Sequence, residues 1–144
     1  MSDEVRVIDP ETGGAKGQKE AVIGDACPKA LLELAKVYGL GRKKYARLNY
    51  LKGYNYSSSY DALQRHLMLF WSGEEKDGEG EVKELVANGQ FPVTEEEAWA
   101  LVLAKVDQDG NVLNSGLHHL AHATWHCLCL LAFVLRGIGK DDRP

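Results

Sequence analysis

The feature that most constrains the fold of this chain is a long apolar stripe at helical spacing between residues 117 and 135. A helix with such a stripe must bury it against other elements, and shorter stretches with the same period occur at 31–38, 63–71 and 98–102. We therefore expect an all-α fold, a compact helical bundle of about four main helices. The residues of the long stripe are Leu117, Leu120, Ala121, Thr124, Leu128, Leu131 and Leu135.

Capping residues and helix breakers predict where these helices begin and end. Residues 1–24 show little apolar periodicity and are expected to form an extended arm or loop, and 74–93 a loop with a short helix at 81–87. The first helix is expected to start at Pro28 and to end at Gly39 and Gly41. The second is expected to follow Ser57–Ser59, and the third to follow Thr94 with Glu97. The last is expected to follow Asn114 or Ser115 and to end at Arg136 and Gly137.

Length and charge limit the class of protein. The 144 residues favour a single domain over residues 1–144. The net charge of −4 and a pI near 5.7 argue against stable nucleic-acid binding, although a local basic cluster would suffice for a nucleotide. No apolar run is long enough to cross a membrane, and the acidic start lacks the apolar segment of a secretory signal.

The cysteines indicate a reducing compartment. There are three, without a Cys-x-x-Cys pair, which argues against a disulfide framework and against a structural zinc site. Cys127 and Cys129 lie in an apolar stretch and are expected to be buried. We therefore expect a cytoplasmic protein.

Histidines are concentrated in the expected last helix, which holds four of the five within nine residues. His119, His122, His126 and Cys129 share one helix face, whereas His118 points away from it. Imidazoles that converge in this way indicate a metal site or a proton-transfer site. The alternative is a set of partly buried histidines that hydrogen-bond to carbonyl groups.

A pair of carboxylates follows the helix that contains Arg65 and His66. Glu74 and Asp77 are one turn apart if that helix continues. Hard oxygen ligands of this kind can hold Mg²⁺ together with a phosphate. The alternative is an acidic, solvated surface loop.

A third group of residues is basic and suits a polyphosphate. Glycines at positions 13, 14 and 17 would let backbone N–H groups approach a phosphate, but the spacing of a Walker A loop is absent. The alternative is that the basic residues only keep the surface soluble. The candidates are Lys16, Lys43, Lys44, Arg47, Lys52 and Arg65.

Three short blocks of the sequence, taken in order, carry a family resemblance. They are Thr12–Gly17, then Lys44–Gly53 followed by Ala62–Leu67 and Trp71–Glu74, and last Ser115–Ala123. Together they resemble the dATP/dGTP diphosphohydrolase family, small MazG-like proteins common in phage genomes. The resemblance covers about residues 12–77 and 114–135, separated by an insert at 78–113. This helical or loop insert is a candidate lid, base-selecting element or oligomer contact.

The resemblance implies a helical nucleotide pyrophosphohydrolase. Such enzymes cleave a nucleoside triphosphate, here a purine deoxynucleotide such as dATP or dGTP, to the monophosphate and pyrophosphate. They use Mg²⁺ or Mn²⁺ held by acidic side chains, which neutralises the triphosphate and activates water. They usually assemble as dimers or tetramers, so a homo-oligomer is expected, in the host cytoplasm if the protein is phage-encoded.

The resemblance also implies roles for particular residues. Glu74 and Asp77 match the second acidic pair of MazG proteins, whereas the first pair has no clean counterpart and His119 and His122 take a comparable place. These four are the expected metal ligands, with Glu74, His119 and His122 catalytic, and the imidazoles would favour Mn²⁺. Position 126, usually Asn in the family, is His126 here. The expected substrate-binding residues are Lys16, Lys44, Arg47, Asn49, Lys52, Arg65 and His66, with Tyr45, Tyr50 or Trp125 to stack on a base.

Two other functions stay open on the sequence. The incomplete acidic motif is compatible with a non-catalytic nucleotide-binding or regulatory module on the same scaffold. The histidines could instead be buried at the interface of an oligomeric interaction protein.

Overall fold

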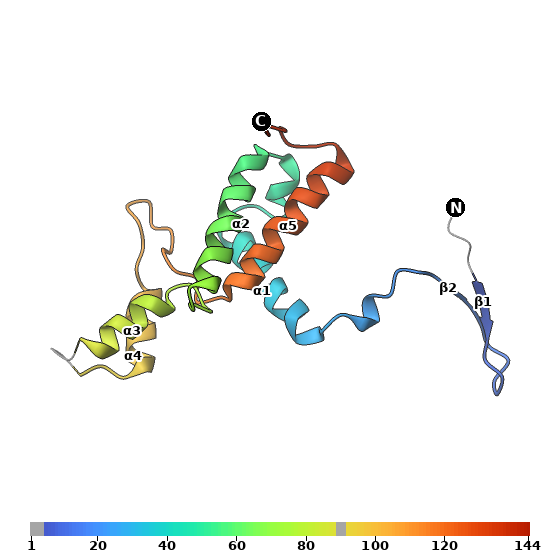
Figure 1. Cartoon of the computed structure of the whole chain (residues 1–144), viewed down its shortest axis with the longest axis horizontal. Coiled ribbons are helices and arrows are strands. Elements are labelled where there is room, and N and C mark those ends of the chain that lie inside the picture. Colours follow the sequence, from blue (N-terminus) through green and yellow to red (C-terminus); the bar gives the residue numbers. More distant parts are fainter. Residues whose placement is uncertain (1–4, 89–91) are drawn as a thin grey trace. The chain divides into compact units, whose positions relative to one another are not determined.

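The structure of the chain, a computed structural model, describes residues 5–88 and 92–144 (Figure 1). The chain divides into two compact units, one up to Leu31 and one from Leu32 onward. Helices dominate, with five α-helices and one two-stranded sheet in the described part of the chain. The predicted all-α fold class is therefore confirmed.

The first unit contains a small antiparallel hairpin. Strand β1 (Val5–Ile8) pairs with β2 (Ala15–Gln18), with Val5 opposite Gln18. The turn between them is organised by Asp9, whose Oδ1 accepts hydrogen bonds from the backbone of Glu11 and Thr12 and from the Thr12 hydroxyl. The expected arm is thus a strand pair in residues 5–18, and residues 1–4 lie outside the described part.

Helices α2 and α5 carry the larger core of the second unit. Helix α2 (Tyr56–Trp71) packs along α5 (His119–Arg136), and α1 spans Pro28–Lys44 (Figure 1). Fully buried side chains come from both packed helices. They are Phe133, His119, Cys129 and Ser59.

Helices α3 and α4 form a separate, smaller core within residues 78–113 of the second unit. Helix α3 (Glu79–Ala87) and α4 (Glu95–Leu103) lie side by side, as Figure 1 shows. Their contact is made by buried Val82, Ala98 and Val102. The predicted capping box is present, because the Thr94 hydroxyl accepts from the Glu97 N–H and the Glu97 carboxylate accepts from the Thr94 N–H.

Helix α1 is longer than predicted. It continues through Gly39 and Gly41 to Lys44 instead of ending at the glycines. A glycine inside a helix costs only about 1 kcal/mol, which the packing of the helix can offset. The three basic residues of the last turn, Arg42–Lys44, also favour the continuation because they face the negative end of the helix dipole.

Two predicted helix starts were wrong. Asn55, not Ser57–Ser59, precedes α2, and His118, not Asn114 or Ser115, precedes α5. At both positions the serine hydrogen-bonds to a residue far away in the sequence. The Ser57 N–H and hydroxyl donate to the Asp142 carboxylate, and the Ser115 N–H donates to the Asp77 carboxylate.

The expectation for Cys127 was also wrong. Cys129 is buried, but Cys127 is exposed, since residues two apart on a helix point in different directions. All three cysteines are free. None of the described helices is long and apolar enough to cross a membrane.

Candidate functional site

The site is built where the loop after α2 meets the segment before α5. Backbone hydrogen bonds join the two: the Asp77 N–H donates to the Leu117 carbonyl at 3.0 Å, and the Gly116 N–H donates to the Asp77 carbonyl at 3.0 Å. The His119 N–H donates to the Glu75 carbonyl at 2.9 Å. This pairing brings both candidate carboxylates to the first turn of α5.

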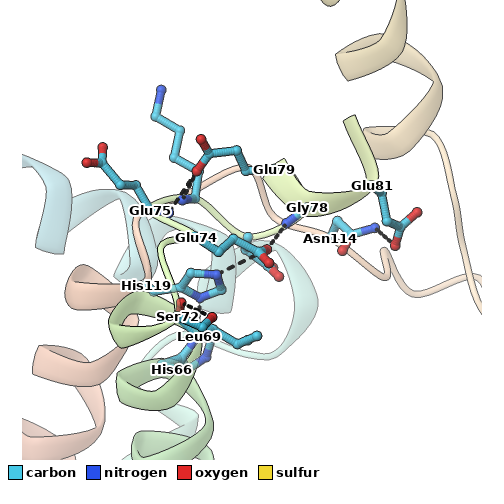
Figure 2. Close-up of polar contacts among 12 residues, drawn as sticks. His66, Leu69, Ser72, Glu74, Glu75, Gly78, Glu79, Glu81, Asn114 and His119 are labelled. Carbon is cyan, nitrogen blue, oxygen red and sulfur yellow. Dashed lines mark hydrogen bonds and ion pairs between the residues drawn. The ribbon is translucent and has the colours of Figure 1, made fainter. Parts of the chain in front are cut away.

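Glu74 contacts a histidine of the helical core. Its Oε1 lies 3.3 Å from Nε2 of His119, a fully buried side chain. Figure 2 shows the Glu74 carboxylate pointing toward this ring, with His66 on the opposite side of it. The Nδ1 atoms of His119 and His66 are 2.9 Å apart, so one ring donates and the other accepts. Glu74 Oε1 also accepts from the Gly78 N–H at 3.3 Å.

Asp77 reaches the same cluster through a serine. Its Oδ2 accepts from the Ser115 N–H at 2.7 Å, and the Ser115 hydroxyl lies 2.8 Å from Nε2 of His122. The His122 ring stacks on the ring of His66, with centroids 4.5 Å apart and planes at 6°. Both carboxylates are therefore connected to His66, one through His119 and the other through Ser115 and His122.

The cluster continues along α5 to a half-buried tyrosine, Tyr54. The His126 ring lies 6.0 Å from His66, and its Nδ1 is 3.1 Å from the Ser59 hydroxyl. That hydroxyl is 2.7 Å from the Tyr54 hydroxyl, which lies 3.1 Å from Cys129 Sγ. Burial raises the pKa of Tyr54 and of the Cys129 thiol, so both groups keep their protons at neutral pH.

The electrostatics of the cluster favour neutral imidazoles. Burial, followed by the neighbouring histidines, lowers the pKa of His66 to about 4. Burial, then His122 and Arg65, lowers the pKa of His126 to about 4, and burial also lowers the pKa of His122. These three rings are uncharged at neutral pH and can each accept a proton.

The carboxylates of the site have the chemistry of ligands for a hard divalent cation. Among residues 5–88 and 92–144, His, Cys, Asp and Glu side chains form no group of three that could hold a metal ion as they stand. Mg²⁺ in nucleotide enzymes is commonly held by one or two carboxylates, the substrate phosphates and water. Glu74 and Asp77 fit that requirement. Both ring nitrogens of His119 already have partners, because one lies against Glu74 and the other against His66.

A cavity of about 680 Å³ lies between the end of α1, the segment 46–50 and α5. Arg47 and Asn49, two of the expected substrate-binding residues, line it. So do the three aromatic residues expected to stack on a base, Tyr45, Tyr50 and Trp125.

The other basic candidates lie outside the cavity lining. The Lys44 ammonium is placed over the Tyr45 ring at 5.5 Å, and Lys52 ends a 3-10 helix, Asn49–Lys52. Arg65 is exposed on α2 beside His66 in the sequence. Lys16 belongs to the first unit, on β2, whereas the cluster and the cavity lie in the second unit.

Several residues of the site were not expected from the sequence. Ser59 and Ser115 were interpreted only as helix caps, yet both hydrogen-bond to histidines. Tyr38 was assigned to a helix face, yet it lines the cavity. Ser59 and Ser115 could have been identified from the sequence, because each lies close to a histidine-rich or tyrosine-rich segment.

The fold and the cluster define a helical protein in which carboxylates and neutral histidines share one site. The chain belongs to the dATP/dGTP diphosphohydrolase family, because the family model "dATP/dGTP diphosphohydrolase, N-terminal" matches residues 10–91. The matched segment contains His66, Glu74 and Asp77, whereas the histidines of α5 lie beyond it. No curated protein and no solved structure matches the chain. Membership in this family supports hydrolase activity on nucleotides.

Proposed function

We propose that this protein is a metal-dependent nucleoside triphosphate pyrophosphohydrolase that converts dATP or dGTP to the monophosphate and pyrophosphate. The observation that carries this proposal is the contact of Glu74 with the buried histidine His119 in a chain of a diphosphohydrolase family. A carboxylate joined to imidazoles can serve both of the reaction's needs, a cation ligand and a proton acceptor.

Glu74 and Asp77 are the proposed ligands of Mg²⁺ or Mn²⁺. A divalent cation supplies charge neutralisation of the triphosphate and Lewis acidity at the phosphoryl group. The hydrogen bonds from Gly78 and Ser115 hold the two carboxylates in place. We keep His119 and His122 as candidate ligands. For either to bind the cation, its present hydrogen bond with Glu74 or Ser115 must be exchanged.

His119 and His122 are also the proposed proton carriers. The attack of water on the α-phosphorus releases a proton, and a neutral imidazole can accept it. His122 is suited to this role because its lowered pKa keeps it unprotonated at neutral pH. His119 is suited because it lies between Glu74 and His66 and can pass a proton along that contact.

Phosphate binding is proposed for the basic residues. Arg47 and Asn49 line one cavity, where a guanidinium and an amide can donate hydrogen bonds to a bound nucleotide. His66 is the proposed donor from α2. The remaining proposed phosphate contacts of the second unit are Lys44, Lys52 and Arg65, and the role of Lys16 stays a prediction from the sequence.

A turnover panel tests the function. The purified chain is incubated with each dNTP and NTP in the presence of Mg²⁺, Mn²⁺ or a chelator, and the products are separated by chromatography. We expect monophosphate and pyrophosphate from the purine deoxynucleotides, and their loss on chelation. Release of triphosphate and nucleoside would overturn the proposed reaction, and undiminished activity with chelator would overturn the metal dependence.

A matched pair of variants tests the site. We expect Glu74→Gln to lower kcat by about a hundredfold or more, because one charge of the proposed cation site is lost. Glu75→Gln is the control, since Glu75 is the adjacent exposed carboxylate and uses its backbone in the contact with His119. Equal activity of the two variants would remove Glu74 from the site.

A non-catalytic nucleotide-binding module is the second candidate function. It is favoured by the absence of a three-residue metal group in the described part of the chain. Calorimetry that detects dNTP binding, in a protein that releases no pyrophosphate with any metal, would select this candidate.

A further inference from the structure

The cavity beside α5 has the composition of a site for a flat aromatic ligand. Tyr38, Tyr50 and Trp125 line it, and their three rings contact one another. The centroid distances are 6.0 Å for Tyr38 and Tyr50, 6.1 Å for Tyr38 and Trp125, and 5.8 Å for Tyr50 and Trp125, all with edge-to-face geometry. Each ring comes from a different element, so the tertiary fold rather than local sequence forms this aromatic wall.

Arg42 of α1 and His126 of α5 line the cavity, and two further polar residues come from one short segment. Arg47 and Asn49 flank Leu48, which is the only non-glycine residue with positive φ in the described part of the chain, at 58°. A leucine in this conformation costs about 1–2 kcal/mol, and its side chain is 52% exposed, so burial does not compensate the strain. Strain of this kind is typical of segments that position ligand-binding groups.

The cavity adjoins the histidine cluster. His126 lines the cavity and also stacks near His66 at 6.0 Å. From His66 the contacts lead to His119 and then to Glu74. A ligand in the cavity would therefore have one end toward the residues proposed to carry the chemistry.

We propose that this cavity binds the purine nucleoside part of the substrate. The base packs on the aromatic wall of Tyr38, Tyr50 and Trp125, and Asn49 and Arg47 bind its polar edge. An amide pairs with the N6 and N7 positions of adenine, and a guanidinium pairs with O6 and N7 of guanine, whereas pyrimidines present neither edge. This inference rests on the proposed function for the identity of the ligand, and it adds the place and the residues that select the base.

Binding of monophosphates without metal tests the proposal apart from turnover. The probes are dGMP, dAMP and dCMP, measured by calorimetry with the full chain. We expect the purine nucleotides to bind about tenfold or more tightly than dCMP, and Trp125→Leu to weaken them by about tenfold, the effect typical of losing one stacking partner. Trp99→Leu is the matched control, because Trp99 lies on α4 outside this cavity.

Fluorescence gives a second measurement that leaves the cavity intact. In a protein with Trp71→Phe and Trp99→Phe, Trp125 is the remaining tryptophan, and we expect dGMP to quench its emission. Absence of quenching, equal affinity for dCMP, or unchanged affinity in Trp125→Leu would overturn the proposed base site. These outcomes differ from failure of the proposed function, which would show as purine binding without hydrolysis.

Discussion

Single histidines of the cluster are expected to make the stability of the fold sensitive to acid. The pKa of His126 is lowered to about 4 in the fold, whereas an unfolded histidine has its pKa near 6.5. The unfolded chain therefore binds more protons between these values. The stability contributed by neutral His126 is present above pH 6.5 and is lost as the pH falls through about 4. We expect the urea midpoint, measured by circular dichroism, to decrease as the pH is lowered through this range.

A variant pair assigns this dependence to the cluster. His126→Asn keeps a polar partner for Ser59 and removes the titrating ring, so its urea midpoint is expected to change less with pH. His118→Asn is the control, because His118 precedes α5 and the cluster is built from other histidines. Parallel pH curves for the parent and His126→Asn would show that His126 does not control acid stability.

The cysteines give a residue-scale test of burial. Cys27 and Cys127 are exposed, and Cys129 is buried against Tyr54, with its pKa raised by burial. A thiol reagent attacks the thiolate, so the native protein is expected to react rapidly at two thiols and at the third only after urea is added. Cys129→Ser should leave the rapid phase unchanged. Three rapid thiols would contradict the packing of α5 on α2.

At the scale of elements, the C-terminal segment is held against the start of α2. Lys140 and residues 54–56 exchange backbone hydrogen bonds of 3.0 and 3.1 Å. Gly53 lies beside this pairing with φ of 79°, and a Cβ there would stand 2.7 Å from the Cα of Gly139. We expect Gly53→Ala to lower the free energy of unfolding by about 1–3 kcal/mol, measured by urea denaturation.

A glycine in a regular helix provides the opposite expectation. Gly39 lies inside α1 with no atom near the place of its missing Cβ. Gly39→Ala should therefore raise the free energy of unfolding by about 0.5–1 kcal/mol. If Gly39→Ala lowered the free energy of unfolding as Gly53→Ala does, the inferred difference between the surroundings of these two glycines would be wrong.

How far the sequence predicts these elements depends on whether the signal is local. The apolar stripe of 117–135 and the Thr94–Glu97 capping box are local patterns, and the structure has a helix at each. The spacing of His119, His122 and His126 likewise placed them on one face. Their contact with His66, 53 residues from His119, depends on how α2 packs against α5, which no local pattern encodes. Of the aromatic wall, Tyr50 and Trp125 were expected to stack on a base, whereas the place of Tyr38 in the cavity escaped prediction for the same reason.

At the scale of the whole molecule, an exposed apolar groove is a candidate surface for self-association. Leu67, Met68, Phe70, Trp71 and Leu120 line a groove of about 500 Å³. Trp71 is 88% exposed and Met68 63% exposed, and contiguous apolar surface of this kind usually marks a protein interface. A second copy of the chain is the proposed occupant, consistent with the oligomer expected from the family resemblance.

Sedimentation tests this assembly. We expect the parent chain to be a dimer or tetramer and Trp71→Glu to shift it toward monomer, because a charge in the groove opposes burial. Val86→Glu is the control, since Val86 is an exposed apolar residue on α3 outside the groove. A monomeric parent, or the same shift in both variants, would exclude this groove as the interface.

Ligand binding should appear in the stability of the folded protein. A ligand that binds only the native state raises the free energy of unfolding, by about 2.7 kcal/mol at a hundred times its dissociation constant. We expect the melting temperature to rise with a non-hydrolysable dGTP analogue, and to rise further when Mg²⁺ is added. Trp125→Leu should reduce the first increment, because it removes part of the proposed base site. Glu74→Gln should reduce only the second, because it removes a proposed cation ligand. A melting temperature insensitive to nucleotide and metal alike would favour the interaction protein, in which the histidines serve packing alone.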